Sequence, residues 1–248
     1  MKKVLAINSS RRKQNTYNLL TQIKEILEKQ DIEVEIISLY DYEIKDCIGC
    51  ERCVLKDNCV LKDDTELVKE KMLAADGIIL SSPVYLRQVS GKLKTFVDRT
   101  CSWFHRPPLC AKPILAVATT KGSGLKSTLN YIDELTEQWG AMSAGQIGTT
   151  IRTENEKIQS KQLDNFVKLL NHPEKFSPSF ANLMNFQVQK ALSAHLLETD
   201  RIYWDKMNWR NKSYYFDCKI SFFKKLIPTM VGKKITKAMS KSEAIIDK

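Results

Sequence analysis

Four cysteines stand close together between residues 47 and 59, in the spacing C-x2-C-x2-C-x5-C. Thiols at two-residue gaps can converge on one compact centre, because a tight loop turns side chains at that interval inward. Cysteine thiolates are ligands of iron–sulfur clusters and of structural zinc. Spacing alone does not choose the metal. We therefore predict a [4Fe–4S] site, a zinc site or a group of free thiols, formed by Cys47, Cys50, Cys53 and Cys59.

The remaining three of the seven cysteines are scattered through the chain, at Cys101, Cys110 and Cys218. An odd total with one tight group is typical of a reducing compartment rather than of a disulfide framework. No apolar run is long enough to cross a bilayer, and the start of the chain is interpreted as a buried strand rather than a signal peptide. We therefore expect a cytoplasmic protein in which the three scattered cysteines are small buried hydrophobes.

A second candidate site lies in the polar segment 8–16, NSSRRKQNT, which separates an apolar stretch from an amphipathic one. The free N–H groups and the dipole at the start of a helix attract a phosphate monoester. Arg11 can add charge-assisted hydrogen bonds. The segment has neither a glycine-rich dinucleotide fingerprint nor a Walker lysine. The alternative is a polar loop in which Asn15 only caps the helix.

Alternating strand and helix patterns must position these loops. Strands are expected at 4–8, 32–39, 77–82, 113–119 and 141–150, and helices at 15–29, 65–75, 90–103, 125–139 and 154–170. Asp63 and Asp64 are expected to cap the second helix. This alternation predicts a doubly wound, five-stranded parallel sheet covered on both faces. Ligands of such sheets bind beyond the carboxyl ends of the strands.

The loop after the third strand begins Ser82-Pro83-Val84-Tyr85. Pro83 fixes its own φ and holds the loop in an extended course. Extended backbone can offer peptide groups to the edge of a flat heterocycle, while Tyr85 or Leu86 packs against its face.

Residues 1–170 resemble the NAD(P)H-dependent FMN reductase branch of the flavodoxin-like superfamily. The resemblance lies in three loops, namely the polar segment 8–16, here called the phosphate loop, the segment 82–94 and the segment 119–124. Asn8, Ser10 and Gln14 stand where that branch has glycine, proline and glycine. The resemblance implies that FMN is bound and that NAD(P)H is a transient co-substrate. It assigns the cofactor to Ser9, Arg11, Asn15, Thr16, Ser82, Pro83, Val84, Tyr85, Leu86, Thr119, Gly122, Ser123 and Gly124.

The cysteine loop in turn resembles the compact motif of iron–sulfur flavoproteins, in which a cluster exchanges single electrons with FMN and ferredoxin is the suggested partner. By this resemblance we expect the loop 47–59 to lie beside the flavin. No catalytic side chain is expected, since the redox chemistry belongs to the flavin. The three histidines, His105, His172 and His195, are interpreted as scaffold.

The resemblances imply an FMN-dependent oxidoreductase that passes reducing equivalents from NAD(P)H to a quinone, a flavin or another small acceptor. The alternative is an iron–sulfur flavoprotein that carries electrons between ferredoxin, a [4Fe–4S] cluster and FMN. A zinc-stabilised binding module is a third class. The family resemblance also implies a homodimer or a larger homo-oligomer.

His172-Pro173 and Ser177-Pro178 mark a break, so we expect an FMN-binding domain at 1–171 and a helical, aromatic-rich extension at 172–248. Most of the net charge of +10 lies in this extension, so no nucleic-acid role is indicated. We expect its basic stretch 219–241 to pack on the core or a partner subunit rather than on a membrane. One hypothesis for the aromatic run 203–216 is that it covers the flavin of its own or of a neighbouring subunit.

Overall fold

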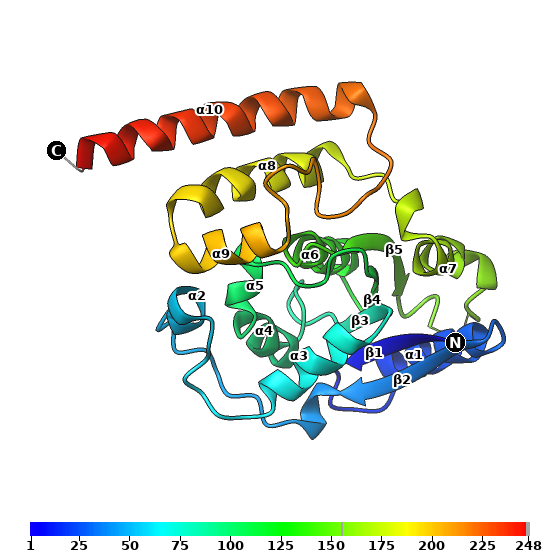
Figure 1. The fold of residues 1–248 in the computed structure, drawn as a ribbon. Helices are drawn as coiled ribbons and strands as arrows, with labels where there is room; N and C mark the ends of the chain where they lie inside the picture. The colour runs from blue at the N-terminus through cyan, green and yellow to red at the C-terminus, as the bar shows by residue number, and fades with distance from the viewer. Residues whose placement is uncertain (155, 247–248) are drawn as a thin grey trace.

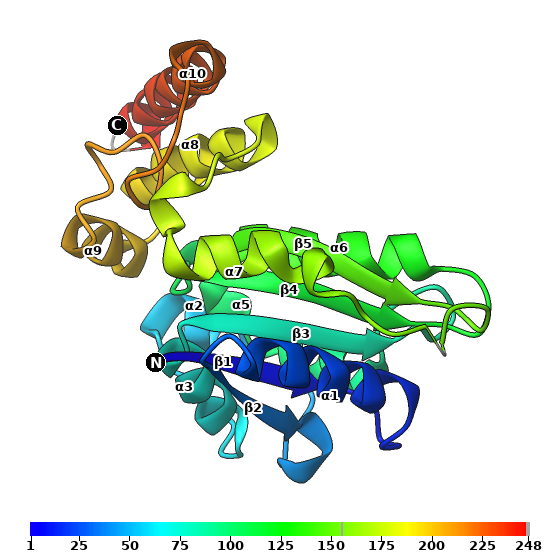
Figure 2. The same cartoon turned by 90° about the vertical axis from the view of Figure 1, so that its right-hand side faces the viewer.

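A five-stranded parallel sheet forms the centre of the computed structural model, which describes residues 1–154 and 156–246. Its strand order is β2-β1-β3-β4-β5. The strands are β1 Lys2–Asn8, β2 Ile32–Ser38, β3 Gly77–Pro83, β4 Pro113–Thr119 and β5 Met142–Thr149. This is the order of flavodoxin-like doubly wound folds, so the predicted fold class is confirmed. All neighbouring strands pair in parallel, and Figure 2 shows arrowheads gathered at one edge of the sheet.

The central strands are buried along their whole length because helices cover both faces of the sheet. Every residue of β3 and β4 is buried, as expected for strands covered on both sides. One face packs against α1 Asn15–Glu28 and α7 Asp164–Asn171. The other face packs against α3 Thr65–Ala74, α4 Gly91–Asp98 and α6 Leu125–Gln138.

Two expected helices are shorter than the sequence pattern suggested. The helix expected at 90–103 is divided into α4 and α5 Cys101–His105. Trp139 stabilises the division, since its Nε1 donates to Thr100 Oγ1 at 3.1 Å. The helix expected at 154–170 begins only at the 3-10 turn η2 Ser160–Leu163, where Gln159 and Gln162 form a reciprocal cap. Tertiary hydrogen bonds and local caps therefore override the apolar periodicity at these ends.

The extension consists of η3 Pro173–Lys175, α8 Phe180–His195, α9 Glu198–Lys206 and α10 Phe222–Ile246 (Figure 1). Its aromatic run is part of the hydrophobic core on the α1 and α7 face. Trp204 Nε1 donates to His105 O at 3.0 Å, and Trp209 Nε1 donates to Tyr215 O at 2.8 Å. These rings therefore pack inward as core, and the hypothesis that they cover the flavin of their own chain is wrong.

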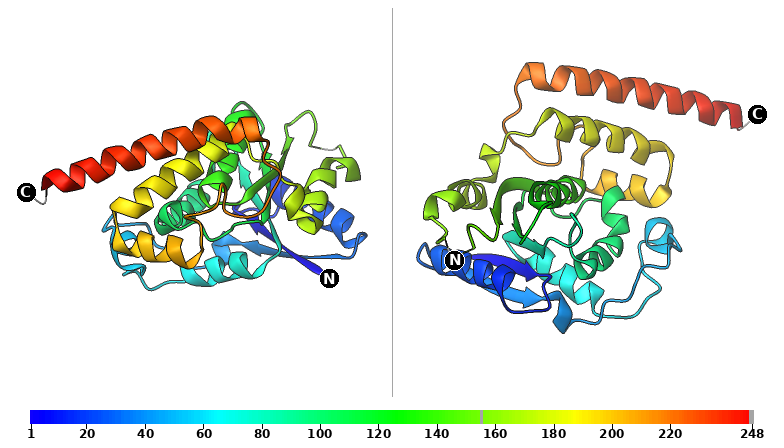
Figure 3. Two further views of the ribbon diagram at one scale, coloured as in Figure 1. Left: turned by 45° about the horizontal axis from the view of Figure 1, so that its top comes forward. Right: turned by 180° about the vertical axis from the view of Figure 1, so that it is seen from behind.

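Helix α10 lies against α8 on the side away from the sheet (Figures 1 and 3). Gly232 allows this contact, because a Cβ there would lie 2.9 Å from Gln187 Oε1. The outward residues at the start of α10 are apolar and exposed, among them Phe222, Phe223 and Ile227. Among the described residues, no helix has the length and apolarity needed to cross a membrane.

The cysteine-bearing connection between β2 and α3 contains η1 Leu39–Asp41 and α2 Arg52–Lys56. At its end, Arg99 forms a buried ion pair with Asp63, and both side chains are 1% exposed. Asp63 Oδ1 also accepts the Thr65 N–H at 3.1 Å, so Asp63 rather than Asp64 caps α3. Burial alone would raise the pKa of Asp63, but hydrogen bonds from Arg99, the Lys45 N–H and Thr65 outweigh it and lower the pKa.

A second buried ion pair fastens α2 to the extension. Arg106 pairs with Asp200 of α9, and both side chains are 4% exposed. The same guanidinium donates to Cys53 O at 2.7 Å and to Val54 O at 3.2 Å. His105 Nδ1 lies 2.9 Å from the other oxygen of Asp200, which makes this histidine part of the scaffold.

Replacing Trp204 with Ala should lower the free energy of unfolding by about 3–5 kcal/mol, because a fully buried ring leaves a cavity. Urea denaturation measures this change. Phe223→Ala is the control, since Phe223 is 84% exposed and its replacement should change stability little. An equal loss in both variants would contradict a core role for the aromatic run.

Replacing Asp63 with Asn should cost about 3 kcal/mol at neutral pH, because it leaves Arg99 buried without a counter-charge. The folded-state pKa of Asp63 is lowered, so its stabilisation is complete above the ordinary carboxyl pKa and is lost as pH falls toward the folded value. The difference between wild type and D63N should therefore shrink between about pH 5 and pH 2. Glu28→Gln, at an exposed pair with Lys24, should show no such effect.

Candidate functional site

The phosphate loop joins β1 to α1 and leaves the first amides of the helix free. Gln14 precedes α1 and makes no side-chain cap hydrogen bond to the described residues. Asn15 does not act as the cap, since its Nδ2 donates to Glu154 Oε2 at 2.6 Å. A fourteen-residue helix with uncapped N–H groups presents donors and a positive dipole end to an anion.

Serine hydroxyls beneath the loop join the end of β1, the end of β3 and the start of α4. Ser9 Oγ donates to Ser81 O at 2.8 Å. Ser90 Oγ lies 2.9 Å from Ser9 Oγ. Ser82 Oγ accepts the Ser90 N–H at 2.8 Å. All four residues are buried. The sequence assigned Ser9 and Ser82 to the cofactor. In the structure their hydroxyl groups form hydrogen bonds that position the loops.

The loop after β3 makes a tight turn that depends on close backbone contacts. Tyr85 and Gln88 exchange backbone hydrogen bonds, while Leu86 and Arg87 have φ values of 48° and 67°. Non-glycine residues in this region carry strain. Gly124 lies against the turn, where a Cβ would come within 2.5 Å of Arg87 Cα. Glycine at 124 is thus required by the close approach of two loops as well as by its φ of 98°.

These loops surround a cavity of 320 Å³ at the carboxyl ends of the strands. Six of the residues assigned to the cofactor line it: Asn15, Thr16, Pro83, Val84, Tyr85 and Thr119. The other assigned residues do not: Ser9, Arg11, Ser82, Leu86, Gly122, Ser123 and Gly124. Leu86 is 100% exposed at the tip of the turn.

Five lining residues were not predicted, namely Ser10, Arg12, Gln14, Thr120 and Lys121. The sequence could have indicated these five residues, because each lies next to or between predicted residues on the loops after β1 and β4. The conformation of each loop decides which of two adjacent side chains faces the cavity, and the spacing of residues in the sequence does not reveal that conformation. The donor set fits an FMN monophosphate: hydroxyls, amides, two cations and free helix amides converge on one polar cavity.

The four loop cysteines also share one cavity, a small and mainly apolar space of 60 Å³. Cys47 and Cys50 are exposed, whereas Cys53 and Cys59 are half-buried, and all seven cysteines of the chain are free. Arg99 Nη2 donates to Cys59 Sγ at 3.3 Å. Among the described residues, no three Cys, His, Asp or Glu side chains meet closely enough for one metal ion. Four thiols spread around a cavity with a cationic donor fit a multi-iron cluster, whose ligands bind separate irons.

Cys101 is a fifth thiol on this cavity. It is exposed, so the expectation of a small buried hydrophobe is wrong for this residue. Desolvation of its thiol, together with nearby Cys53 and Cys47, raises the pKa of Cys101. Cys110 and Cys218 are half-buried.

The cysteine cavity and the cavity at the strand ends are separate. The loop after β3, residues 84–90, here called the flavin loop, lies at the start of α4, whereas Arg99 and Cys101 follow its end. The eight residues of α4, about 12 Å along the helix axis, lie between Ser90 and Arg99. Figure 2 shows α2 and α5 at the opposite end of the sheet from the arrowheads. No residue lines both cavities, so the expectation that the cysteine loop lies beside the flavin stays a prediction.

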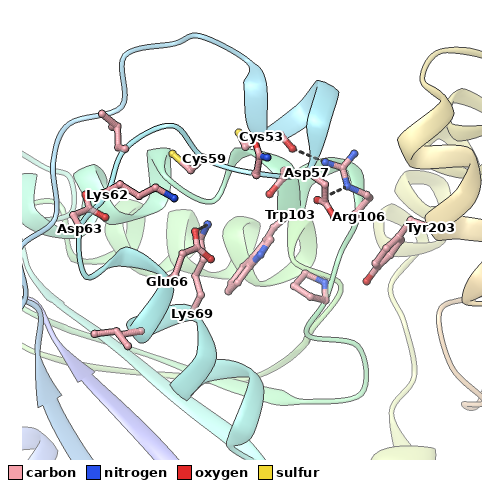
Figure 4. A pocket seen from close by; sticks show the side chains of 15 residues that line it. Cys53, Asp57, Cys59, Lys62, Asp63, Glu66, Lys69, Trp103, Arg106 and Tyr203 are labelled. Atoms are coloured by element: carbon pink, nitrogen blue, oxygen red, sulfur yellow. Dashed lines mark hydrogen bonds and ion pairs between the residues drawn. The ribbon is translucent and has the colours of Figure 1, made fainter.

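A larger cavity of 620 Å³ lies on the other side of the cysteine loop. Cys53 and Cys59 border both cavities. Figure 4 shows Trp103 at the centre of this cavity, between Lys69 on α3 and Tyr203 on α9. Lys69 Nζ lies 5.8 Å from the centre of the Trp103 ring. Burial raises the pKa of Tyr203 to about 12, so its hydroxyl stays protonated at neutral pH.

Curated relatives with a similar sequence are described as iron–sulfur flavoproteins. One from Archaeoglobus fulgidus is 49% identical over 98 residues, which are 40% of this chain and 48% of that protein. The match thus spans about half of that relative. Another from A. fulgidus is 29% identical over 217 residues, 82% of this chain and 97% of that protein. One from Methanosarcina thermophila is 29% identical over 148 residues, 58% of this chain and 77% of that protein.

Two solved structures share the fold at low sequence identity. RosB with bound 8-demethyl-8-formylriboflavin-5′-phosphate has a TM-score of 0.56 at 14% identity, covering 90% of this chain and 92% of RosB. A flavone reductase has a TM-score of 0.52 at 16% identity, covering 69% of this chain and 62% of that chain. The sequence profile of the NADPH-dependent FMN reductase family matches residues 2–153, which is more than half of the chain. The chain therefore belongs to the NADPH-dependent FMN reductase family and has a flavodoxin-like fold.

Proposed function

We propose that the protein is an electron-transfer flavoprotein that binds FMN at the strand ends and a [4Fe–4S] cluster on Cys47, Cys50, Cys53 and Cys59. The observation that carries this proposal is that all four thiols line one cavity, with Arg99 donating to Cys59 Sγ. The similarity to iron–sulfur flavoproteins supports it. FMN would supply two-electron and one-electron chemistry, and the cluster would supply single-electron transfer.

The residues of the chain would bind and orient these groups. The free amides of α1, with Asn15 and Thr16, would hold the phosphate, and Arg12 and Lys121 would balance its charge. The extended backbone from Pro83 to Tyr85 would face the ring system. The assignment of Arg11, Leu86, Gly122, Ser123 and Gly124 stays a prediction, since these residues do not line the cavity.

Arg99 would stabilise negative charge on the cysteine centre. Its guanidinium lies between Asp63 and Cys59 and is almost fully buried. A hydrogen bond to a cysteine sulfur favours the reduced, more negative state of a cluster and therefore raises its potential. Ferredoxin is the proposed macromolecular partner.

A second candidate function is NAD(P)H-dependent reduction of a quinone, a flavin or another small acceptor. The family profile over residues 2–153 favours it, since its description names NADPH. Tyr85 is 49% exposed beside the FMN cavity, so the outer face of the flavin would be open to a nicotinamide. The 620 Å³ cavity bordered by Cys53 and Cys59 would admit a small acceptor near the cluster.

We also propose a homo-oligomer in the reducing cytoplasm. The exposed apolar residues at the start of α10 form a surface that association would cover. Reduced thiols at Cys47 and Cys50 are exposed and would be maintained there.

Anaerobic purification should yield about one FMN, four irons and four sulfides per chain. Cys50→Ala should abolish iron binding and keep the flavin, because the two cavities are separate. Iron, sulfide and flavin analyses measure this. Cys218→Ala is the matched control, since Cys218 packs against the aromatic cluster. A flavin spectrum without iron would reject the cluster, and zinc without flavin would favour a binding module.

Flavin bleaching by NADPH or NADH, but not by reduced ferredoxin, would favour the second candidate.

Thr16→Val should weaken FMN binding about tenfold, because it removes a hydroxyl worth about 1–1.5 kcal/mol from the phosphate cavity. Thr16 Oγ1 also lies 2.6 Å from Thr119 Oγ1. Fluorescence titration of the apoprotein with FMN measures the dissociation constant. Thr21→Val on the same helix is the control and should bind FMN as wild type does. Unchanged affinity in T16V would place the phosphate elsewhere.

A further inference from the structure

The 620 Å³ cavity beside the cysteine loop is lined by a lysine that is almost fully enclosed. The side chain of Lys69 on α3 is 7% exposed, and its Nζ donates to Glu66 Oε1 at 2.9 Å. Glu66 is 61% exposed, so this counter-charge is largely solvated. The other N–H donors of Lys69 have no oxygen acceptor among the described residues. Lysine is rarely buried with so little compensation, because an ammonium group is costly to remove from water.

The carboxylates that line this cavity already have cationic partners. Asp63 pairs with Arg99, and Asp57 pairs with Arg106 at 3.2 Å. The third carboxylate is that of Glu66, which accepts from the enclosed lysine. The acidic groups are therefore neutralised within the chain, and the hydrogen-bonding capacity that is left over belongs to donors.

Trp103 adds a second donor of this kind. Its side chain is 7% exposed, and its Nε1 donates to no described residue. This nitrogen is not one of the fully enclosed atoms that lack a partner, so the N–H is still accessible. Figure 4 shows Lys62 and Lys69 extending toward the cavity in which Trp103 lies. An anionic oxygen would satisfy such donors.

The apolar part of the lining favours a flat ring. It consists of Leu61, Leu67, Trp103, Pro108 and Tyr203. Lys69 Nζ lies 5.8 Å from the centre of the Trp103 ring, so a ring packed on the indole brings a charged substituent close to the ammonium. Tyr203 donates its hydroxyl to Pro107 O at 3.3 Å. Because burial raises the pKa of Tyr203 to about 12, this phenol adds no negative charge that would repel an anion.

We propose that this cavity is a binding site for a planar aromatic carboxylate, with the ring against Trp103 and the carboxylate at Lys69. The oxygen atoms of the ligand would accept the hydrogen bonds that Lys69 Nζ and Trp103 Nε1 do not make within the chain. Cys53 and Cys59 border the same cavity, so the ligand would lie beside the cysteine centre. The inference concerns binding and does not depend on the proposed flavin or cluster.

The test uses 1-naphthoate, a two-ring carboxylate, as the probe. Its binding to the purified full-length protein is measured by isothermal titration calorimetry. The alcohol 1-naphthalenemethanol has the same rings without the charge, and cyclohexanecarboxylate has the charge without a flat ring. Wild type should bind 1-naphthoate about tenfold more tightly than either compound, because only 1-naphthoate satisfies both the donors and the apolar wall.

Lys69→Met should weaken the binding of 1-naphthoate about tenfold and leave that of 1-naphthalenemethanol unchanged, because it removes the charge and keeps the apolar stem. Trp103→Phe should weaken 1-naphthoate binding about fivefold, since a ring remains but the N–H is lost. Lys71→Met is the matched control on α3. Lys71 pairs with Glu35 outside this cavity, so K71M should bind 1-naphthoate as wild type does.

Far-UV circular dichroism verifies that each variant is folded, and Lys69→Gln replaces K69M if the methionine variant is not. Equal affinity of wild type and K69M for 1-naphthoate, or no binding to wild type, would overturn the inference. A protein that binds 1-naphthoate through Lys69 but contains no iron would support this site and reject the cluster. A protein with a complete cluster whose affinity for 1-naphthoate does not depend on Lys69 would overturn this inference alone.

Discussion

The guanidinium of Arg106 holds together parts of the chain that are far apart in sequence. It follows α5, pairs with Asp200 of α9 and donates to two carbonyls of α2. A buried cation without these partners would be costly, so the three segments must meet for the charge to be tolerated. The cysteine loop and the C-terminal extension are therefore positioned by one side chain. The pairing of Arg99 with Asp63 does the same at the other end of the loop.

This scaffold separates two kinds of chemistry. The FMN cavity is formed by strand ends and by free amides of a helix, which are fixed by the sheet itself. The cysteine cavity lies at the other end of α4 and depends on ion pairs and loop packing. Changes at either centre can therefore leave the other intact. Arg99 contacts Cys59 and directly follows α4, whose other end adjoins the loop after β3.

The extension contributes to stability more than to either site. Its aromatic rings belong to the same hydrophobic cluster as α1 and α7, and two indole N–H groups, those of Trp204 and Trp209, donate to backbone carbonyls. Large amphipathic rings of this kind are buried only when their polar atoms find partners. Among the described residues of the extension, Tyr203 lines the large cavity beside the cysteine loop (Figure 4).

Local patterns in the sequence determined the order of strands and helices, the parallel sheet and the three loops that meet at its edge, because periodicity and loop chemistry act over a few residues. They also identified the cysteine group, whose members are neighbours in sequence. Only the tertiary structure decided that Cys101 joins that group, that Ser9 and Ser82 support the loops from below, and that the cysteine cavity lies at the opposite end of α4 from the flavin loop. These facts depend on contacts between distant segments, such as Arg106 with Asp200 and Ser9 with Ser90. Such contacts arise from packing of whole elements, and no local spacing encodes them.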